Sequence, residues 1–427
     1  MKNTIFAFLL FSFFAVSYSN ADEIFFSLST EAQNFYLNPQ NSANLFGRVD
    51  LQSKGAYRFT RSLQFKLNAT VNSVFMNKQD QQQVVFSPQQ FGFLYSKKVF
   101  DLHIGGFTFA PGGAAINNIF GVINSVDYRQ PFNSKAIGSY GALLTLPLDA
   151  LTVKLFYIPK NSKSILPDTQ SPWWPRTEQL PIRNNGGTFI IPENMSYVYK
   201  TDEEYKKPFD NNFGGSLKYS FSMLDLHLFY FSGAHQMPKM SANPNITGIS
   251  LQPVVGIIQP PVELGKLWYR SEHIGAGTTF VLADWITKVF CKQQTDYLAT
   301  EERYPSCTFT LENSFALGGV STHYFLQSNR TWRASSTTTE IETLTGFFEK
   351  SFLIGFLTDM DTKGTVSGAV IYNEKNPAWM TSLSYEYRLS DQMRSKLSLN
   401  SIFASGDPLA KAYDQTDNAV LMLTYDF

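Results

Sequence analysis

An aspartate and a histidine two residues apart are the strongest candidates for catalysis in this sequence. Asp225 and His227 occur in LDLHLFYF, and alternate residues of an extended strand share one face, so both side chains point the same way. Such a pair can act as general acid and base. The alternative is that both are polar residues beside a water-filled channel. The sequence contains no HExxH metal motif and no GxSxG nucleophile elbow, and His273 is expected at a membrane interface. We therefore expect no enzyme, no metal site and no cofactor.

Charged residues of both signs alternate along two neighbouring segments. Arg48, Asp50 and Lys54 share one face of residues 48–59, and Lys66 lies on the polar face of residues 63–75. Charges of mixed sign around a pore produce a transverse field that orients polar solutes. We expect these four residues, together with Asp225 and His227, to line a channel. The alternative is that this face is polar only because it contacts water, without any role in orienting solutes.

Residues 110–136 form a loop whose composition suggests that it folds inward. It begins APGGAA and continues through apolar Ile119 and Phe120, which are unusual in a water-exposed loop. Folding this loop into a barrel would bury the apolar residues and bring Asp127, Tyr128 and Arg129 beside the channel. We expect these three residues to form a constriction. A surface loop packed on its neighbours is the alternative.

The elements that must position these residues are strands, because the sequence alternates apolar and polar residues with a period of two. Leu63, Phe65 and Leu67 occupy one face and Gln64 and Lys66 the other. Similar units recur to the end of the chain, at residues 151–157, 224–231, 379–388 and 396–403. This periodicity is typical of strands with one apolar and one polar face.

The connections between these segments alternate between short and long. RFTRS, YSKKV, LPLDA and RLSDQM are short, whereas residues 110–136, 159–211 and 234–272 are long. Several short turns follow closely after a tyrosine, at Tyr57, Tyr95, Tyr219 and Tyr387. Tight turns at one end, long loops at the other and a ring of aromatic residues are typical of a transmembrane barrel. A β-sandwich or solenoid adhesin would not produce this alternation.

Composition agrees with a sheet protein in an unusual solvent. Only 16% of residues are charged while 15% are aromatic, and Lys+Arg equal Asp+Glu at 35 each, which argues against a nucleic-acid partner. No run of 18 apolar residues follows the N-terminal segment, so a helical membrane protein is not expected. Cys291 and Cys307 are expected to form a disulfide flanking a loop over residues 292–306, with two unpaired thiols as the alternative.

The N-terminus predicts export. Residues 1–21 contain one positive charge at Lys2, an apolar run from Ile5 to Val16, and small residues at Ser19 and Ala21, which together are typical of a cleaved signal peptide. An uncleaved anchor is the alternative. Residues 22–427 would then form a single barrel whose long extracellular loops are residues 110–136, 159–211 and 234–272.

The C-terminus carries a more specific pattern. In residues 418–427 (NAVLMLTYDF) every second residue is apolar or aromatic, from Ala419 through Leu421, Leu423 and Tyr425 to the terminal Phe427. This ending resembles the final strand of Gram-negative outer-membrane β-barrels. The resemblance implies an outer-membrane location, contact with lipid, recognition of the last strand by the barrel assembly machinery, and pairing of that strand with the first.

A narrower resemblance rests on one loop. In GVINSVDYRQPFNS, residues 121–134, the residues Asn124, Asp127, Tyr128, Arg129 and Pro131 match a motif of an uncharacterised group of large proteobacterial outer-membrane proteins. Ser125 stands where that group usually has proline. The group has no settled activity, so the resemblance bears on architecture.

These observations predict an all-β protein, a transmembrane antiparallel up-and-down β-barrel of about 16–18 strands, with 18 if residues 307–328 form a hairpin. Sixteen or more strands leave a lumen wide enough for water. We expect a porin for passive diffusion of small solutes, with the solute unidentified. A transporter of hydrophobic molecules and a non-conducting surface receptor or adhesion barrel are the alternatives, and association into homo-oligomers is left open.

Overall fold

The fold was analysed in a computed structural model of the chain. Within the described residues no helix is long and apolar enough to cross a membrane. Residues 1–20, which hold most of the expected signal peptide, lie outside the described part. The structure describes residues 21–35, 45–76, 84–112, 118–130, 133–169, 171–173, 179–181, 188–190, 197–251, 254–317, 320–333, 349–361, 363–374, 377–404 and 416–427.

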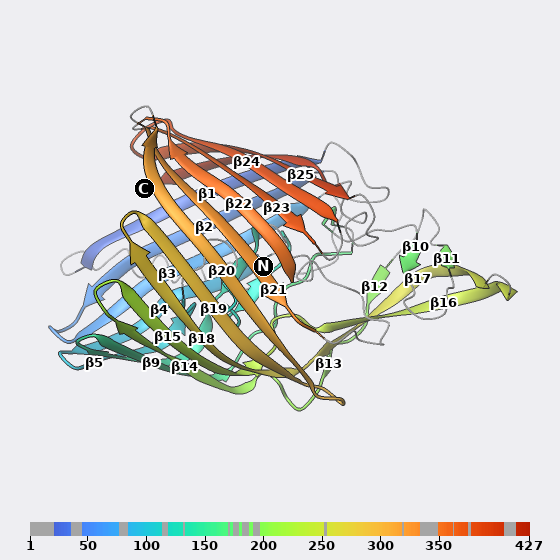
Figure 1. Ribbon diagram of the computed structural model, residues 1–427, viewed down its shortest axis with the longest axis horizontal. Coiled ribbons are helices and arrows are strands. Elements are labelled where there is room, and N and C mark those ends of the chain that lie inside the picture. The colour runs from blue at the N-terminus through green and yellow to red at the C-terminus, as the bar shows by residue number, and fades with distance from the viewer. Residues whose placement is uncertain are drawn as a thin grey trace.

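Eighteen strands of the described chain form one antiparallel sheet that closes into a barrel (Figure 1). Each strand pairs with the next along the sheet. In order they are β1 (Ala21–Phe35), β2 (Leu45–Arg58), β3 (Leu63–Met76), β4 (Val84–Lys97), β5 (Phe100–Phe107), β8 (Ser139–Leu148), β9 (Leu151–Lys160), β14 (Asp210–Ser220), β15 (Leu224–Ala234), β18 (Arg270–Leu282), β19 (Trp285–Tyr297), β20 (Glu302–Leu317), β21 (Val320–Thr331), β22 (Lys350–Asp359), β23 (Gly364–Asn373), β24 (Ala378–Arg388), β25 (Met393–Ala404) and β26 (Asn418–Asp426).

The last strand closes the barrel against the first. The ladder between β1 and β26 runs from Phe35 opposite Asn418 to Ser27 opposite Asp426, and the Phe427 amide donates to the Phe26 carbonyl at 2.8 Å. Closure leaves no unpaired barrel edge, which a bilayer could not hydrogen-bond. The predicted up-and-down barrel is confirmed at the upper end of its strand range, because β20 and β21 form the hairpin that the higher number requires.

The two faces of the barrel wall follow the period-two pattern of the sequence. On β25, Leu397 and Leu399 are 49% and 46% exposed on the outer surface, whereas Ser398 between them is buried on the inner one. The same arrangement places Phe65 on the outer surface, in edge contact with Phe91 at 5.4 Å. The apolar outer side chains suit contact with the hydrocarbon of a bilayer, and the polar inner side chains suit a water-filled lumen.

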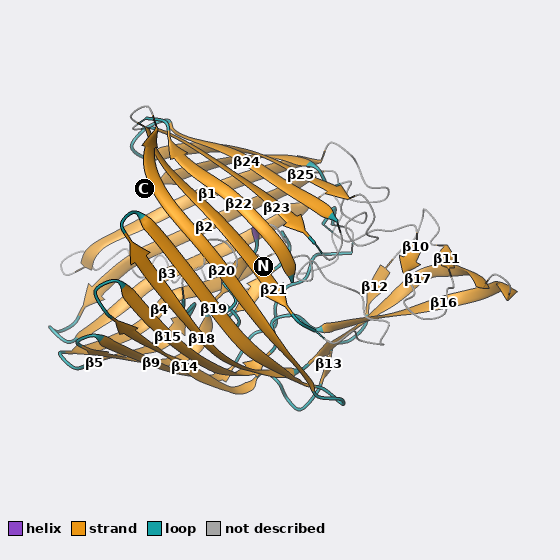
Figure 2. Cartoon of the chain, in the orientation of Figure 1, coloured by secondary structure: helices purple, strands orange, loops and turns teal. Residues whose placement is uncertain are grey.

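Tight turns lie together at one end of the barrel (Figure 2), and aromatic side chains lie beside several of them. Tyr57 contacts Phe59 at 4.9 Å, and Tyr219 contacts Phe221 at 4.6 Å, each beside a short turn. The turn after β8 is so tight that Asp149 adopts a φ of 47°, a conformation that aspartate tolerates better than most residues. These turns are where the sequence predicts them.

The loops predicted at residues 159–211 and 234–272 contain strands that the sequence did not predict. Residues 234–272 are mostly a hairpin of β16 (Lys239–Leu251) and β17 (Val254–Trp268), and barrel strand β18 already begins at Arg270. This hairpin extends beyond the barrel end in Figure 1. Short strands of the earlier loop join β16 and β17 in a second sheet. They are β10 (Gln179–Pro181), which pairs with β11, and β11 (Thr188–Ile190), β12 (Tyr197–Tyr199) and β13 (Glu203–Glu204), which pair with β17. Since β11, β12 and β13 pair with β17 in parallel across long sequence separations, local patterns carry no signal for them.

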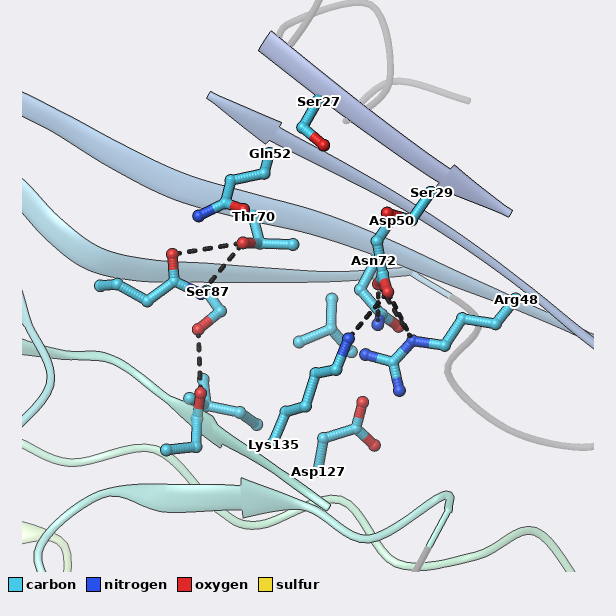
Figure 3. Close-up of a pocket in the computed structure, with 14 residues that line it drawn as sticks. Ser27, Ser29, Arg48, Asp50, Gln52, Thr70, Asn72, Ser87, Asp127 and Lys135 are labelled. Carbon is cyan, nitrogen blue, oxygen red and sulfur yellow. Dashed lines mark hydrogen bonds and ion pairs between the residues drawn. The ribbon is translucent and has the colours of Figure 1, made fainter. Parts of the chain in front are cut away.

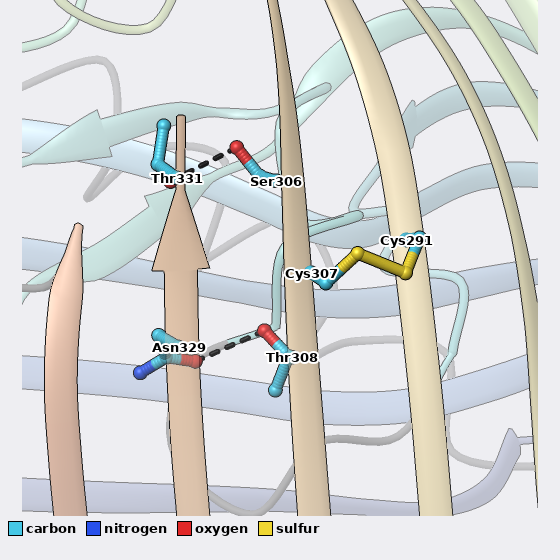
Figure 4. The surroundings of a disulfide bond; sticks show 6 residues. All are labelled: Cys291, Ser306, Cys307, Thr308, Asn329 and Thr331. Carbon is cyan, nitrogen blue, oxygen red and sulfur yellow. Dashed lines mark hydrogen bonds between the residues drawn. A yellow bond between two sulfur atoms is a disulfide. The ribbon is translucent and has the colours of Figure 1, made fainter. Parts of the chain in front are cut away.

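The disulfide Cys291–Cys307 is confirmed, but its place in the fold differs from the prediction (Figure 4). The two residues lie directly opposite each other inside the β19–β20 ladder. The expected loop over residues 292–306 is therefore wrong, because both strands continue beyond the cysteines and leave only residues 298–301 as the connection. The bond therefore ties two strands already paired at this point.

Replacing both cysteines by serine is expected to lower the stability of this hairpin by about 3 kcal/mol, the chain-entropy value for a loop of this length. The wild type under reducing conditions should match the double variant. Heat-modifiable gel mobility with and without reductant measures the effect. Equal mobility curves for oxidised and reduced wild type would show that the ladder alone holds the hairpin.

Candidate functional site

Asp50 is the centre of a polar cluster where loop 110–136 meets the inner wall (Figure 3). Its carboxylate accepts hydrogen bonds from Arg48 Nε at 3.0 Å and from Asn72 Nδ2 at 2.5 Å. Arg48 lies on β2, the strand that carries Asp50, and Asn72 lies on the neighbouring strand β3. Lys135 reaches the same carboxylate from the loop, with Nζ at 2.9 Å from Oδ2. One buried carboxylate thus connects β2, β3 and the loop.

The tip of the loop carries a second ion pair against the same wall. Arg129 pairs with Asp127, with Nη2 at 2.7 Å from Oδ2, and the same guanidinium donates to the Asn72 side-chain oxygen. Both members of the pair are almost fully buried. Tyr128 between them is half-buried, and its backbone amide donates to the Ile165 carbonyl at 2.8 Å. The three expected constriction residues are therefore inside the barrel, and Arg129 contacts the wall directly through Asn72.

Gln130 completes this contact with the first two strands. Its side-chain nitrogen donates to Glu31 Oε1 of β1 at 2.7 Å, and its oxygen accepts from Arg48 Nη1 of β2 at 3.0 Å. An amide that donates to an anion and accepts from a cation satisfies both with one side chain. The loop is thereby fixed to β1, β2 and β3 by charge-assisted hydrogen bonds.

The earlier part of the loop contacts a different wall through apolar side chains. Phe120 is fully buried, stacks on Phe229 of β15 at 5.0 Å and meets Phe290 of β19 edge-on at 5.3 Å. Gly275 of β18 makes room for it, since a Cβ there would lie 2.4 Å from the Phe120 ring. Ile123 joins the same cluster. Between the apolar and the polar contacts, the loop is held in place by Asn124. Its side-chain amide accepts a hydrogen bond from the Phe109 backbone N–H and donates one to the Phe109 carbonyl.

The two attachment sites lie nearly opposite each other across the barrel. In the ring of eighteen strands, β2 and β3 are second and third, while β15 and β19 are ninth and eleventh. Diametrically opposite strands are nine positions apart in such a ring. The segment from Phe120 to Lys135 therefore bridges the barrel interior, polar at one end and apolar at the other.

A second inward segment, residues 161–173, was not predicted. Ile165 pairs with Val126 and Tyr128 of the first loop through backbone hydrogen bonds. Trp173 is buried against Phe35 of β1, with ring centroids 5.3 Å apart. Trp174 and Pro175, which follow it in the sequence, lie outside the described residues. The apolar signal of Trp173 was visible, but its partner on β1 was not.

The remaining predicted residues are spread over the wall. Lys54 is exposed and Lys66 half-buried, and neither has an ion-pair partner within the described chain. Asp225 pairs with Lys218 Nζ at 2.9 Å, while His227 faces the Phe290 ring at 5.4 Å. The Asp225 carboxylate is thus paired with a lysine, which argues against an acid–base pair of Asp225 and His227.

The expectation that His273 lies at a membrane interface is wrong. Its ring is 1% exposed, stacks with Phe231 at 5.8 Å and makes a hydrogen bond with the Ser271 hydroxyl at 2.9 Å. Phe229 and Phe231 of β15 also occupy inner positions beside His273. The period-two pattern therefore predicted which residues of β15 face inward, but not that this part of the inner surface is apolar.

Ion pairs also join the two long insertions beyond the barrel end. Asp202 accepts from Lys163 at 3.0 Å and from Lys266 of β17 at 2.7 Å. Although burial acts to raise the pKa of the Asp202 carboxyl, the hydrogen bonds from Lys266 and Lys163 outweigh it and hold the pKa below its ordinary value. These ion pairs therefore attach the second sheet, which contains β17, to residues 161–173, the second segment that enters the barrel.

Comparison with known proteins bears on the fold. No family model matches the sequence, and no curated protein matches it. Among solved structures, a BenF-like porin from Pseudomonas fluorescens Pf-5 has a TM-score of 0.53 at 10% identity and covers 96% of this chain and 99% of its own. OccK2 (OpdF) of Pseudomonas aeruginosa gives 0.51 at 12%, covering 96% and 98%, and OccAB4 of Acinetobacter baumannii 0.51 at 10%, covering 95% and 98%. The chain shares the porin barrel fold.

Proposed function

We propose that this protein is an outer-membrane porin through which small polar solutes diffuse passively. The apolar outer surface, the polar inner surface and the likeness of the whole barrel to a protein named as a BenF-like porin support this proposal. Diffusion through such a lumen requires no cofactor and no energy source, and we propose no catalytic step. Lys54, Lys66, Arg48 and Asp50 would line the path.

The observation that carries the proposal is the segment that bridges the interior. Its polar end, at Asp127, Arg129 and Lys135, narrows the lumen beside β2 and β3, while its apolar end fills the side beside β15 to β19. Solutes would pass the polar side. The nine described residues of the apolar cluster are packed against one another, so we assign the cluster a supporting role rather than a route for hydrophobic molecules.

Deleting residues 113–130 tests the proposal. Removing the bridge should raise single-channel conductance in planar bilayers severalfold, because the narrowest section then becomes the barrel itself. Deleting residues 246–258 from the projecting β16–β17 hairpin is the matched control and should leave conductance unchanged. Equal conductance for the wild type and the 113–130 deletion would remove the loop from the mechanism.

Conductance also separates the two alternatives. Stable ohmic steps support a porin. Silence combined with binding of fatty acids or alkanes would indicate a transporter of hydrophobic molecules, and silence without such binding a surface receptor or adhesion barrel. One neighbour, OccK2, is described in complex with glucuronate, which makes this sugar acid a suitable first solute for permeation assays.

We further propose that the loop motif places this chain with the uncharacterised proteobacterial outer-membrane group named above. Asn124 fixes the loop backbone, and Asp127 with Arg129 forms its contact to the wall, so the matching residues have connected structural tasks. We also propose that the barrel assembly machinery recognises β26 through its alternating apolar residues and Phe427. We also propose that barrels of this protein associate into homo-oligomers through their lipid-facing walls.

A further inference from the structure

A cavity of about 200 Å³ lies between the loop and strands β1 to β4 (Figure 3). One buried water needs only ~10–15 Å³ of such space, so this cavity is large enough for a small organic solute. Its wall combines residues of four strands with Asp127, Lys135, Ala136 and Ile137 of the inward segment. The cavity therefore exists because the loop docks here.

The charged groups around this cavity cancel one another. Arg48 and Lys135 both contact Asp50, at 3.0 and 2.9 Å, and Asp127 is held by Arg129 just behind the wall. Two cations and two anions line the cavity itself, so its formal charge is zero. A charged solute would gain no net attraction and would have to displace a partner from a buried ion pair, which is unfavourable.

The groups left for a solute are uncharged. Within the described chain the Ser27 hydroxyl makes no hydrogen bond with another protein group, and it can both donate and accept. Gln52 faces the same space, and Thr70 and Gln89 present a hydroxyl and an amide that bond each other at 2.9 Å. Val85 supplies a small apolar surface. Hydroxyl and amide groups opposite an apolar patch match a solute with hydroxyls at its edges and C–H groups on its face.

We propose that this cavity is a binding site for an uncharged, polyhydroxylated solute of monosaccharide size. The proposal rests on the proposed function, since the site would lie on the diffusion path. It adds a solute class: neutral sugars or polyols bind here, and acidic sugars of the same size do not.

Glucose and glucuronate form a matched pair of probes, because they differ by one carboxylate. Each is titrated onto the full mature barrel in planar bilayers, and interruptions of the open-channel current report occupancy. In parallel, saturation-transfer NMR on the detergent-solubilised barrel reports binding whether or not the channel conducts. Glucose should interrupt the current and give a transfer signal, and glucuronate should do neither at the same concentration.

Two substitutions at Ser27 assign the binding to this cavity. Ser27→Ala removes a hydroxyl without removing a protein contact and should weaken glucose binding by roughly five- to tenfold, the value of one hydrogen bond. Ser27→Leu fills the cavity and should abolish binding. Ser401→Leu on β25 is the control, since Ser401 belongs to the outer-facing set of that strand, and it should leave glucose binding unchanged.

The outcomes separate failure of the site from failure of the channel. Conductance with glucuronate binding but no glucose binding overturns the inference and leaves the porin intact. Binding of neither probe also overturns it. A silent barrel that still shows Ser27-dependent glucose binding by NMR supports the site and contradicts the porin. Glucose binding that survives Ser27→Leu places the sugar elsewhere and overturns the assignment.

Discussion

Replacing Asp50 by asparagine is expected to make the lumen attract anions and to destabilise its wall. The substitution keeps the size of the side chain but leaves Arg48 and Lys135 without their common partner. Because Arg48 is 2% exposed at its side chain, its charge would remain buried and uncompensated, at a cost of about 3–5 kcal/mol. Reversal potentials in a salt gradient measure the selectivity, and thermal unfolding in detergent measures the stability.

The control for this experiment is Asp391→Asn. Asp391 lies in the turn between β24 and β25 with a side chain that is 98% exposed, so its pairing with Arg388 contributes little. Both selectivity and unfolding temperature should match the wild type. Unchanged selectivity in Asp50→Asn would show that permeating ions do not pass the cluster around Asp50, and would contradict its place on the diffusion path.

Replacing Phe120 by alanine is expected to detach the bridging segment from the far wall. The ring packs against Phe229 and Phe290 and is fully buried, so its removal should cost about 3–5 kcal/mol of docking free energy. The polar end would remain attached through Arg129 and Gln130. The barrel should still assemble, with larger and more variable conductance, since the loop would fluctuate between docked and undocked states.

Phe403→Ala is the matched control for Phe120→Ala. Phe403 lies on β25 with a side chain 55% exposed on the outer surface, so the same truncation removes no packing inside the barrel. Its conductance should equal that of the wild type. A steady, wild-type current from Phe120→Ala would show that the polar contacts suffice to hold the segment in place.

The candidate site was only partly predictable from the sequence. Apolar Ile119 and Phe120 indicated that this loop folds inward, because apolar side chains are unusual in a water-exposed loop. An inward fold would bring the charged residues Asp127 and Arg129 beside the channel. The sequence could not tell that Arg129 would meet Asn72 or that Phe120 would meet Phe229, since these partners are 57 and 109 residues away and depend on where the ring of strands closes.

Errors in the prediction have a common cause. Residues 234–272 were expected to be a loop because Pro-rich and apolar stretches do not show a two-residue period. In the structure β16 and β17 pair with each other, and β17 also pairs with short strands of the preceding insertion. The loop around the disulfide was placed too widely because β19 and β20 continue beyond the cysteines as one hairpin. In both places two consecutive strands pair with each other where the local pattern is weak.

The strands, their two faces, the tight turns and the terminal closure were determined by the sequence itself, because each depends on the alternation of neighbouring side chains and on the backbone's need for hydrogen bonds. The bridge across the interior, the charge-balanced cavity and the projecting sheet were decided only by the tertiary structure. Their contacts join residues that lie close together only after eighteen strands have closed into a ring, so no local pattern could specify them.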